Sequence, residues 1–87
     1  MPALAIRVHP ADNVAVVAAD VQVGDLVRLA DGSEVRAVGA IPRGSKVALS
    51  PIASGEAAVR YGEEIGRAAQ DIAAGDYVHT HNLARRK

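Results

Sequence analysis

Short apolar runs, broken by glycine and proline, dominate the pattern along this chain of 87 residues. Val, Ile, Leu and Ala fill the runs, a composition typical of strands. The pattern predicts seven strands: Ala3–Val8, Val14–Ala18, Leu26–Ala30, Glu34–Val38, Lys46–Ser50, Ala57–Tyr61 and Tyr77–His81. Strands at this spacing favour one compact all-β domain over residues 1–87, a barrel or clip, rather than alternating strands and helices.

Two segments between these runs carry local signals. Asp31-Gly32 separates two predicted strands and is a strong hairpin-turn sequence. Over Glu63–Ala73, Ile65 and Ile72 fit the apolar stripe of a helix, but two glycines weaken that pattern. This segment leaves helix and strand both open, so the expected fold is mostly β with short helical turns.

A five-residue pattern recurs three times, as Val21–Asp25, Ile52–Glu56 and Ile72–Asp76. Each copy is an apolar residue, two variable residues, a glycine and an acid. We interpret it as a tight turn in which the apolar residue fills the core and the glycine takes a positive φ. The acid then accepts hydrogen bonds from backbone N–H groups, and no chemistry is assigned to it.

Composition predicts a thin core. Hydrophobic residues make up 49% of the chain, but only Tyr61 and Tyr77 are aromatic. Alanine buries little area per residue, and a chain of this size buries only about 60–65% of the surface that its unfolded form exposes. We therefore expect a second chain to cover part of it, either a different partner or, for the isolated chain, a further copy.

Charge and residue usage exclude several classes of function. The formal net charge is zero, which argues against a nucleic-acid binder. No run approaches the roughly 20 apolar residues of a membrane span, so no membrane role is expected. The chain has no cysteine, which excludes disulfides and thiolate metal sites. Its first residues lack a signal segment, and a cytoplasmic protein is the expectation.

The segment from Val78 to Asn82 is the most informative candidate site. On a strand, residues two apart share a face, so His79 and His81 would present two imidazoles to one side. Such a pair can hold a divalent metal, bind an anion or act as acid and base. The alternative is a pair of surface histidines without chemistry.

Two other stretches carry polar candidates. The loop Ile41–Lys46 contains Pro and Gly and would place Arg43 and Lys46 together, where they could clamp a carboxylate or phosphate. A charged loop without a ligand is equally compatible with this sequence. Asp12 and Asn13 precede a valine run; as turn residues they would bond their own backbone, and otherwise they would line a polar site.

Four segments, taken in order, resemble the N-terminal domain of altronate and galactarate dehydratases. They are Asp12–Val16, Ile41–Leu49, Arg60–Ala68 and Gly75–Leu83, and together they extend over nearly the whole chain. That domain is of the SAF type, with a β-clip fold. Four segments in register are more specific than any single motif in this sequence.

The resemblance implies an enzyme that removes water from a sugar acid to give a 2-keto-3-deoxy acid. Family members depend on iron(II) or another divalent metal, held mainly by a much larger catalytic domain. The small domain is fused to that large domain or forms a separate subunit, and the length of this chain favours the separate form. A related pair of subunits, sulfolactate sulfo-lyase, eliminates sulfite instead.

If the chain is a subunit of such an enzyme, its candidate residues can be given roles. His79 and His81 are expected to act in catalysis or as metal ligands. The expected substrate contacts are Arg43, Lys46, Asn82, Asp12 and Asn13. One position departs from the family, which usually has Gly-His-Lys where this chain has Gly44-Ser45-Lys46. Ser45 cannot replace an imidazole in acid–base chemistry or iron ligation.

Three functions remain open from the sequence. The chain is a small subunit that completes a dehydratase or sulfo-lyase site with a large catalytic subunit and a sugar-acid substrate. Alternatively, it is a non-catalytic β-clip module that binds a carbohydrate or anion, a reading that Ser45 favours. The third possibility is a structural partner that stabilises a large subunit through its Val and Ala face.

Overall fold

The computed structural model describes residues 3–84, and every regular element in that range is a strand. The prediction of an all-β fold is therefore confirmed. The strands are β1 (Ala3–Ile6), β2 (Val14–Val17), β3 (Leu26–Arg28), β4 (Glu34–Arg36), β5 (Lys46–Ala48), β6 (Ala57–Arg60), β7 (Glu63–Ala68), β8 (Tyr77–Val78) and β9 (Leu83–Ala84).

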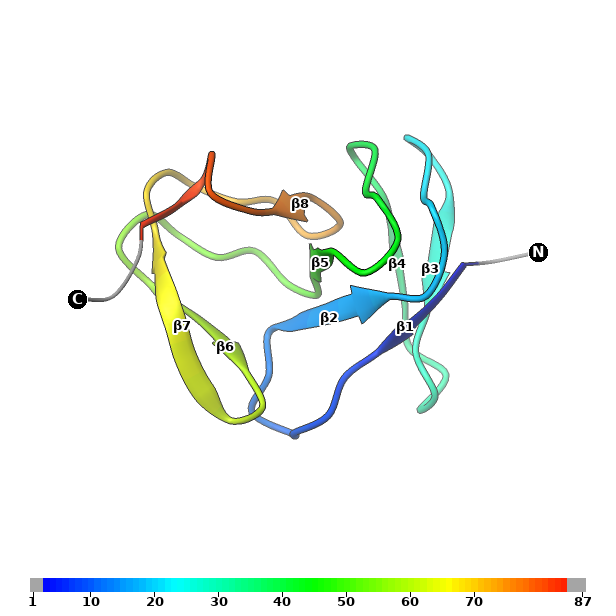
Figure 1. Cartoon of the computed structure of the whole chain (residues 1–87), viewed down its shortest axis with the longest axis horizontal. Coiled ribbons are helices and arrows are strands. Elements are labelled where there is room, and N and C mark those ends of the chain that lie inside the picture. Colours follow the sequence, from blue (N-terminus) through cyan, green and yellow to red (C-terminus); the bar gives the residue numbers. More distant parts are fainter. Residues whose placement is uncertain (1–2, 85–87) are drawn as a thin grey trace.

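The strands form two sheets that lie side by side (Figure 1). Six strands run in the order β4-β3-β1-β2-β5-β8, and all neighbours are antiparallel except β1 and β3. The smaller sheet has the order β6-β7-β9. No helix in residues 3–84 is long and apolar enough to cross a bilayer.

All seven predicted strands form, and each is shorter than predicted. The hairpin at Asp31-Gly32 is confirmed, with Gly32 at φ 89°. The ambiguous segment resolves as strand over Glu63–Ala68, because it pairs with β6 on one side and β9 on the other. The prediction of one strand over Tyr77–His81 is wrong after Val78, where the chain turns.

The recurring turn occurs four times, once more than the sequence pattern indicated. The additional copy is Ile41–Ser45, in which serine stands at the acidic position. The four turn glycines, Gly24, Gly44, Gly55 and Gly75, have φ between 85° and 89°. The four leading apolar residues are buried and join in two bridges, Val21 with Ile41 and Ile52 with Ile72.

These turns reveal an internal duplication with an offset of 31 residues. The N–H of Gly24 bonds to the carbonyl of Ala37, and 31 positions later Gly55 bonds to Ala68 in the same way. Six buried residues have buried counterparts at this offset: Val17 and Ala48, Val21 and Ile52, Val27 and Ala58, Ala37 and Ala68, Ile41 and Ile72, and Val47 and Val78. The fold is therefore two copies of one clip.

Each copy has its own small core. One cluster contains Val21, Val27, Ile41 and Val47, and the other contains their four counterparts. Val and Ala supply most of both clusters, so each residue contributes little burial compared with a Leu or Phe core. The thin core expected from composition is present, divided in two.

Candidate functional site

The turn from His79 to Asn82 is built around the side chain of Asn82. This side chain is fully buried, accepts a hydrogen bond from the His79 N–H at 3.0 Å and donates one to the Tyr77 carbonyl at 2.8 Å. The Asn82 N–H also closes the turn onto the His79 carbonyl. Both functional ends of the amide are therefore occupied by backbone groups, which explains why the strand ends at Val78.

Tyr77 brings the two histidines together, although they do not share a strand face. Its ring stacks on the imidazole of His79, with centroids 5.3 Å apart and planes at 11°. The imidazole of His81 lies against the same ring at 5.4 Å, tilted by 49°. Both imidazoles are on exposed residues, so they can reach a ligand or a neighbouring chain while the tyrosine limits their movement.

A pocket of about 180 Å³ adjoins His79. Its lining comes from Lys46 of β5, Arg60 of β6, Ile65 of β7, Leu83 of β9, and His79 and Thr80 of the β8–β9 connection. Partial burial, and then the positive charge of Arg60, hold the pKa of Lys46 below its usual value. The pocket thus combines two cations, an imidazole and a hydroxyl with an apolar wall.

Arg43 and Ser45 lie outside the lining of this pocket. Arg43 is exposed in the turn Ile41–Ser45, where its backbone N–H donates to the side chain of Asp20. Ser45 takes the acidic position of the same turn. The structure therefore joins Lys46 with Arg60 and His79 rather than with Arg43.

Asp12 and Asn13 brace the loop before β2 against the β6–β7 hairpin. The buried carboxylate of Asp12 accepts N–H bonds from His9 in its own turn and from Tyr61 and Gly62. Asn13 bonds to the backbone of β6 with both ends of its amide. Their polar atoms hydrogen-bond to backbone groups. The bond from His9 lies within the turn, as the turn interpretation expected, and the others join the turn to the β6–β7 hairpin.

The Asp12 brace supports an unusual hairpin turn. Tyr61 has φ 56°, the one non-glycine residue with positive φ within residues 3–84, and Gly62 follows at 74°. Two such residues in succession match the twist of the flanking strands. A non-glycine residue in this region carries a conformational cost, which the hydrogen bonds to Asp12 help to offset.

Desolvation acts to raise the pKa of Asp12, but the three N–H bonds and the nearby imidazole outweigh it, and the pKa lies below its ordinary value. A lowered pKa in the folded state contributes stability above the unfolded value, and that stability is lost as pH falls through the folded value. We expect Asp12→Asn to lower the melting temperature at pH 7, with the difference from wild type shrinking in acid.

Thermal melts of wild type and Asp12→Asn between pH 7 and pH 2 measure this effect. The matched control is Asp25→Asn, because Asp25 is exposed and accepts one N–H bond, from Gln22, in a similar turn. Its drop in melting temperature should be smaller. A gap between wild type and Asp12→Asn that stays constant with pH would contradict this account of Asp12.

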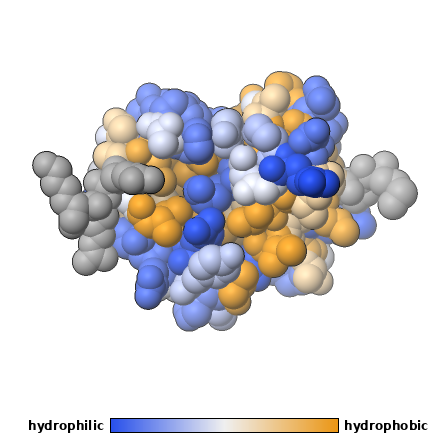
Figure 2. All heavy atoms as spheres, viewed as in Figure 1, coloured by the Kyte–Doolittle hydropathy of each residue, from blue (hydrophilic) through white to orange (hydrophobic). Residues whose placement is uncertain are grey.

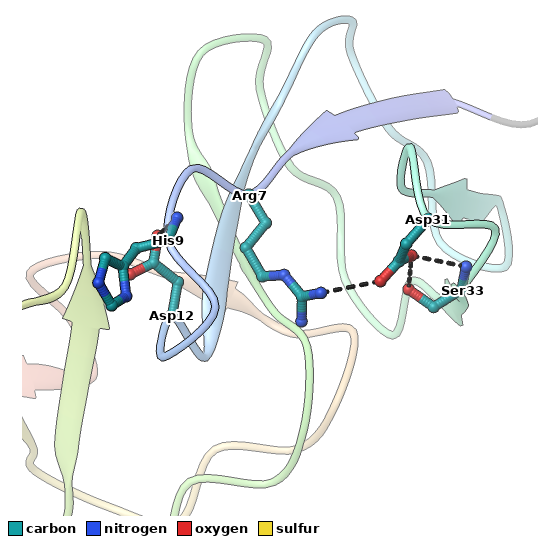
Figure 3. Close-up of polar contacts among 5 residues, drawn as sticks. All are labelled: Arg7, His9, Asp12, Asp31 and Ser33. Carbon is teal, nitrogen blue, oxygen red and sulfur yellow. Dashed lines mark hydrogen bonds and ion pairs between the residues drawn. The ribbon is translucent and has the colours of Figure 1, made fainter.

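A second polar pocket, of about 250 Å³, lies between Arg7, Asn13 and Ser50. Its cation is already paired, since Arg7 contacts Asp31 at 2.8 Å (Figure 3). Asp31 also accepts bonds from Ser33, so this corner is a closed network. The pocket beside His79 is the better candidate for binding an anion.

Residues 3–84 contain no group of three or more His, Asp or Glu placed to hold a metal ion. His79 and His81 are thus at most two ligands among the described residues, and a metal held by them would need further ligands from another chain. The divalent metal that the family resemblance implies, held mainly by the large catalytic domain, stays a prediction.

Comparison with known proteins identifies the family. Residues 3–86 match the model described as the altronate/galactarate dehydratase SAF domain. The chain belongs to that family. Its all-β double clip fits the SAF β-clip, and the match extends over both copies of the duplication.

Three relatives indicate the range of this SAF domain family. The chain is 46% identical to altronate dehydratase of Escherichia coli (strain K12) and 39% identical to altronate dehydratase of Bacillus subtilis (strain 168), each over 88% of this chain. It spans only 15% of the length of those two proteins. It is also 40% identical over 55% of its length to the (2R)-sulfolactate sulfo-lyase subunit alpha of Chromohalobacter salexigens, covering 51% of that subunit.

Sequence reasoning missed Arg60 and Tyr77 as members of the site. A comparison of the two copies at the offset of 31 would have singled out both positions. Arg60 corresponds to Leu29 and Tyr77 to Lys46, so the residue type changes at each. The two copies agree at the turns and in the core but differ at these positions. His79 and His81 likewise correspond to Ala48 and Ser50, so neither histidine has an imidazole counterpart in the first copy.

Proposed function

We propose that this SAF domain contributes one wall of a sugar-acid lyase site that a large catalytic partner completes. The observation that carries the proposal is the cluster of Tyr77, His79, His81 and Lys46 beside a pocket with two cations. This cluster lies in a domain whose relatives include dehydratases and a sulfo-lyase subunit. The substrate is proposed to be a hexonate or hexarate.

The reaction proposed is a β-elimination. A base removes the proton on the carbon next to the carboxylate, the β-hydroxyl leaves, and the enol that forms becomes a 2-keto-3-deoxy acid. Loss of hydroxide from carbon is slow unless the oxygen is protonated as it leaves. We assign that proton to His79 or His81, because an imidazole is the side chain that most often acts as a general acid. Lys46 is placed at the substrate carboxylate.

Asn82, Asp12 and Asn13 are proposed to act by holding the site in shape. Their side-chain atoms bond to backbone groups, so a substitution at these positions would move the turn or the hairpin rather than remove a substrate contact. Arg43 was expected beside the carboxylate, and its exposed position favours a role elsewhere on the surface.

The large partner is proposed to pack on an apolar surface that includes β1. Leu4, Ile6 and Val8 alternate with less exposed residues and are each about 60% exposed. Apolar side chains gather on the side of the molecule that carries β1 (Figure 2). A thin core gains stability when a neighbour covers such a surface. Metal binding is assigned to that partner, and a cytoplasmic location stays a prediction.

Co-expression of this chain with its large partner tests the proposal. The purified complex is offered a panel of hexonates and hexarates, and separately sulfolactate. Formation of a 2-keto-3-deoxy acid is the expected result. Release of sulfite without that product would move the assignment to the sulfo-lyase branch, and a stable complex with no turnover on any of these acids would count against a lyase.

A further inference from the structure

Arg60 occupies a position at which the other copy of the clip has an apolar core residue. Its counterpart, Leu29, is a buried core residue with 6% exposure. Arg60 is half-buried, its guanidinium lies over the Tyr61 ring at 4.9 Å, and its Nε is buried without a hydrogen-bond partner among the described residues. A buried donor without an acceptor is costly, so this N–H is available to an acceptor from a bound group.

The charge around Arg60 is also unbalanced. Arg7, Arg28 and Arg67 each form an ion pair with a carboxylate. No carboxylate of residues 3–84 pairs in this way with Lys46 or Arg60. Two cations lining one pocket repel each other, and an anion between them would relieve the repulsion. The charge of the pocket therefore favours an anionic ligand.

We infer that Lys46 and Arg60 form a carboxylate-binding site, and that Arg60 determines the preference of the site for acids over neutral polyols. The guanidinium can bind a planar carboxylate through two N–H groups, while Lys46 supplies a point charge. Thr80 and His79 can bond to a neighbouring hydroxyl, and Ile65 and Leu83 exclude water from one side. The identification of the carboxylate as that of a sugar acid rests on the proposed function.

Nuclear magnetic resonance on the full chain tests this site directly. The probe is D-gluconate, and D-glucitol is the matched control because it has the same chain of hydroxyls without the carboxylate. The expected result is a saturable shift of the Arg60 Nε–H signal and of the His79 amide signal with gluconate. Glucitol should leave both signals in place.

Three variants separate the possible contacts. Arg60→Gln is expected to weaken gluconate binding by about tenfold or more, the cost of one charged bidentate contact. Arg28→Gln removes an exposed arginine at the end of β3 and should bind like the wild type. Arg43→Gln tests the alternative cation next to Lys46, and it should also bind like the wild type.

A gluconate-dependent shift of the His79 amide signal that persists in Arg60→Gln would overturn the inference. A loss of gluconate binding in Arg43→Gln alone would also overturn it. If the isolated chain shows no shift, the inference is tested on the complex with the large partner, by comparing the KM of Arg60→Gln with that of the wild type. There Arg60→Gln should raise KM about tenfold or more while kcat changes less. An unchanged KM would overturn the inference, whereas gluconate binding without any lyase turnover would leave it standing and sink the proposed function.

Discussion

Replacing His79 and His81 together by alanine is expected to lower turnover of the assembled lyase by about 100-fold or more, the usual contribution of a positioned acid or base. Both imidazoles contact the ring of Tyr77, so each could substitute in part for the other. The double variant is therefore more informative than either single change. Turnover is measured on the purified complex, with assembly checked by size-exclusion chromatography.

His9→Ala is the matched control for the double variant. His9 opens a turn of the same form, with its N–H bonded to Asp12 three residues later, as His79 bonds to Asn82. It lies outside the pocket beside His79, so its replacement should leave turnover of the folded complex close to wild type. Full activity of the double variant with assembly intact would show that the histidines of the second copy do not take part in chemistry.

Gly75→Ala is expected to cost several kcal/mol, a large share of the roughly 4–13 kcal/mol that stabilises a domain of this length. Gly75 has φ 87°, which disfavours any side chain. A Cβ at this position would also clash with the carbonyl oxygen of Arg36. That oxygen belongs to backbone and cannot rotate away, so the two copies of the clip would have to separate.

Gly44→Ala is the control that isolates the steric term. Gly44 is the counterpart of Gly75 in the first copy, has φ 85°, and a Cβ there would meet nothing within 4 Å. We expect it to cost only the conformational term, about 1–2 kcal/mol. Urea unfolding of both variants measures the difference. Equal losses at the two glycines would contradict the close contact between the copies.

Strands and turns were predictable because their signals are local. Runs of Val and Ile predicted seven strands, and a glycine three residues after an apolar residue indicated three of the four turns. The fourth was missed because Ser45 replaces the acid. β7 was ambiguous because its apolar residues fit a helical stripe that Gly62 and Gly66 weaken, and its pairing with two other strands decided it.

The site was predictable only in part, because side chains from distant strands create it. His79, His81 and Lys46 were named from the sequence, and Tyr77 links the two histidines by stacking that no spacing rule gives. The predicted shared strand face was wrong, since the buried Asn82 amide turns the chain after Val78. Arg60 was missed because a lone arginine in a strand has no local signature.

The most direct test of the account measures sugar-acid turnover by the large catalytic partner alone, then with this chain added, then with the chain carrying His79→Ala and His81→Ala. The account predicts that the wild-type chain raises formation of the 2-keto-3-deoxy acid and that the double variant binds without doing so. Equal turnover in all three samples would contradict it.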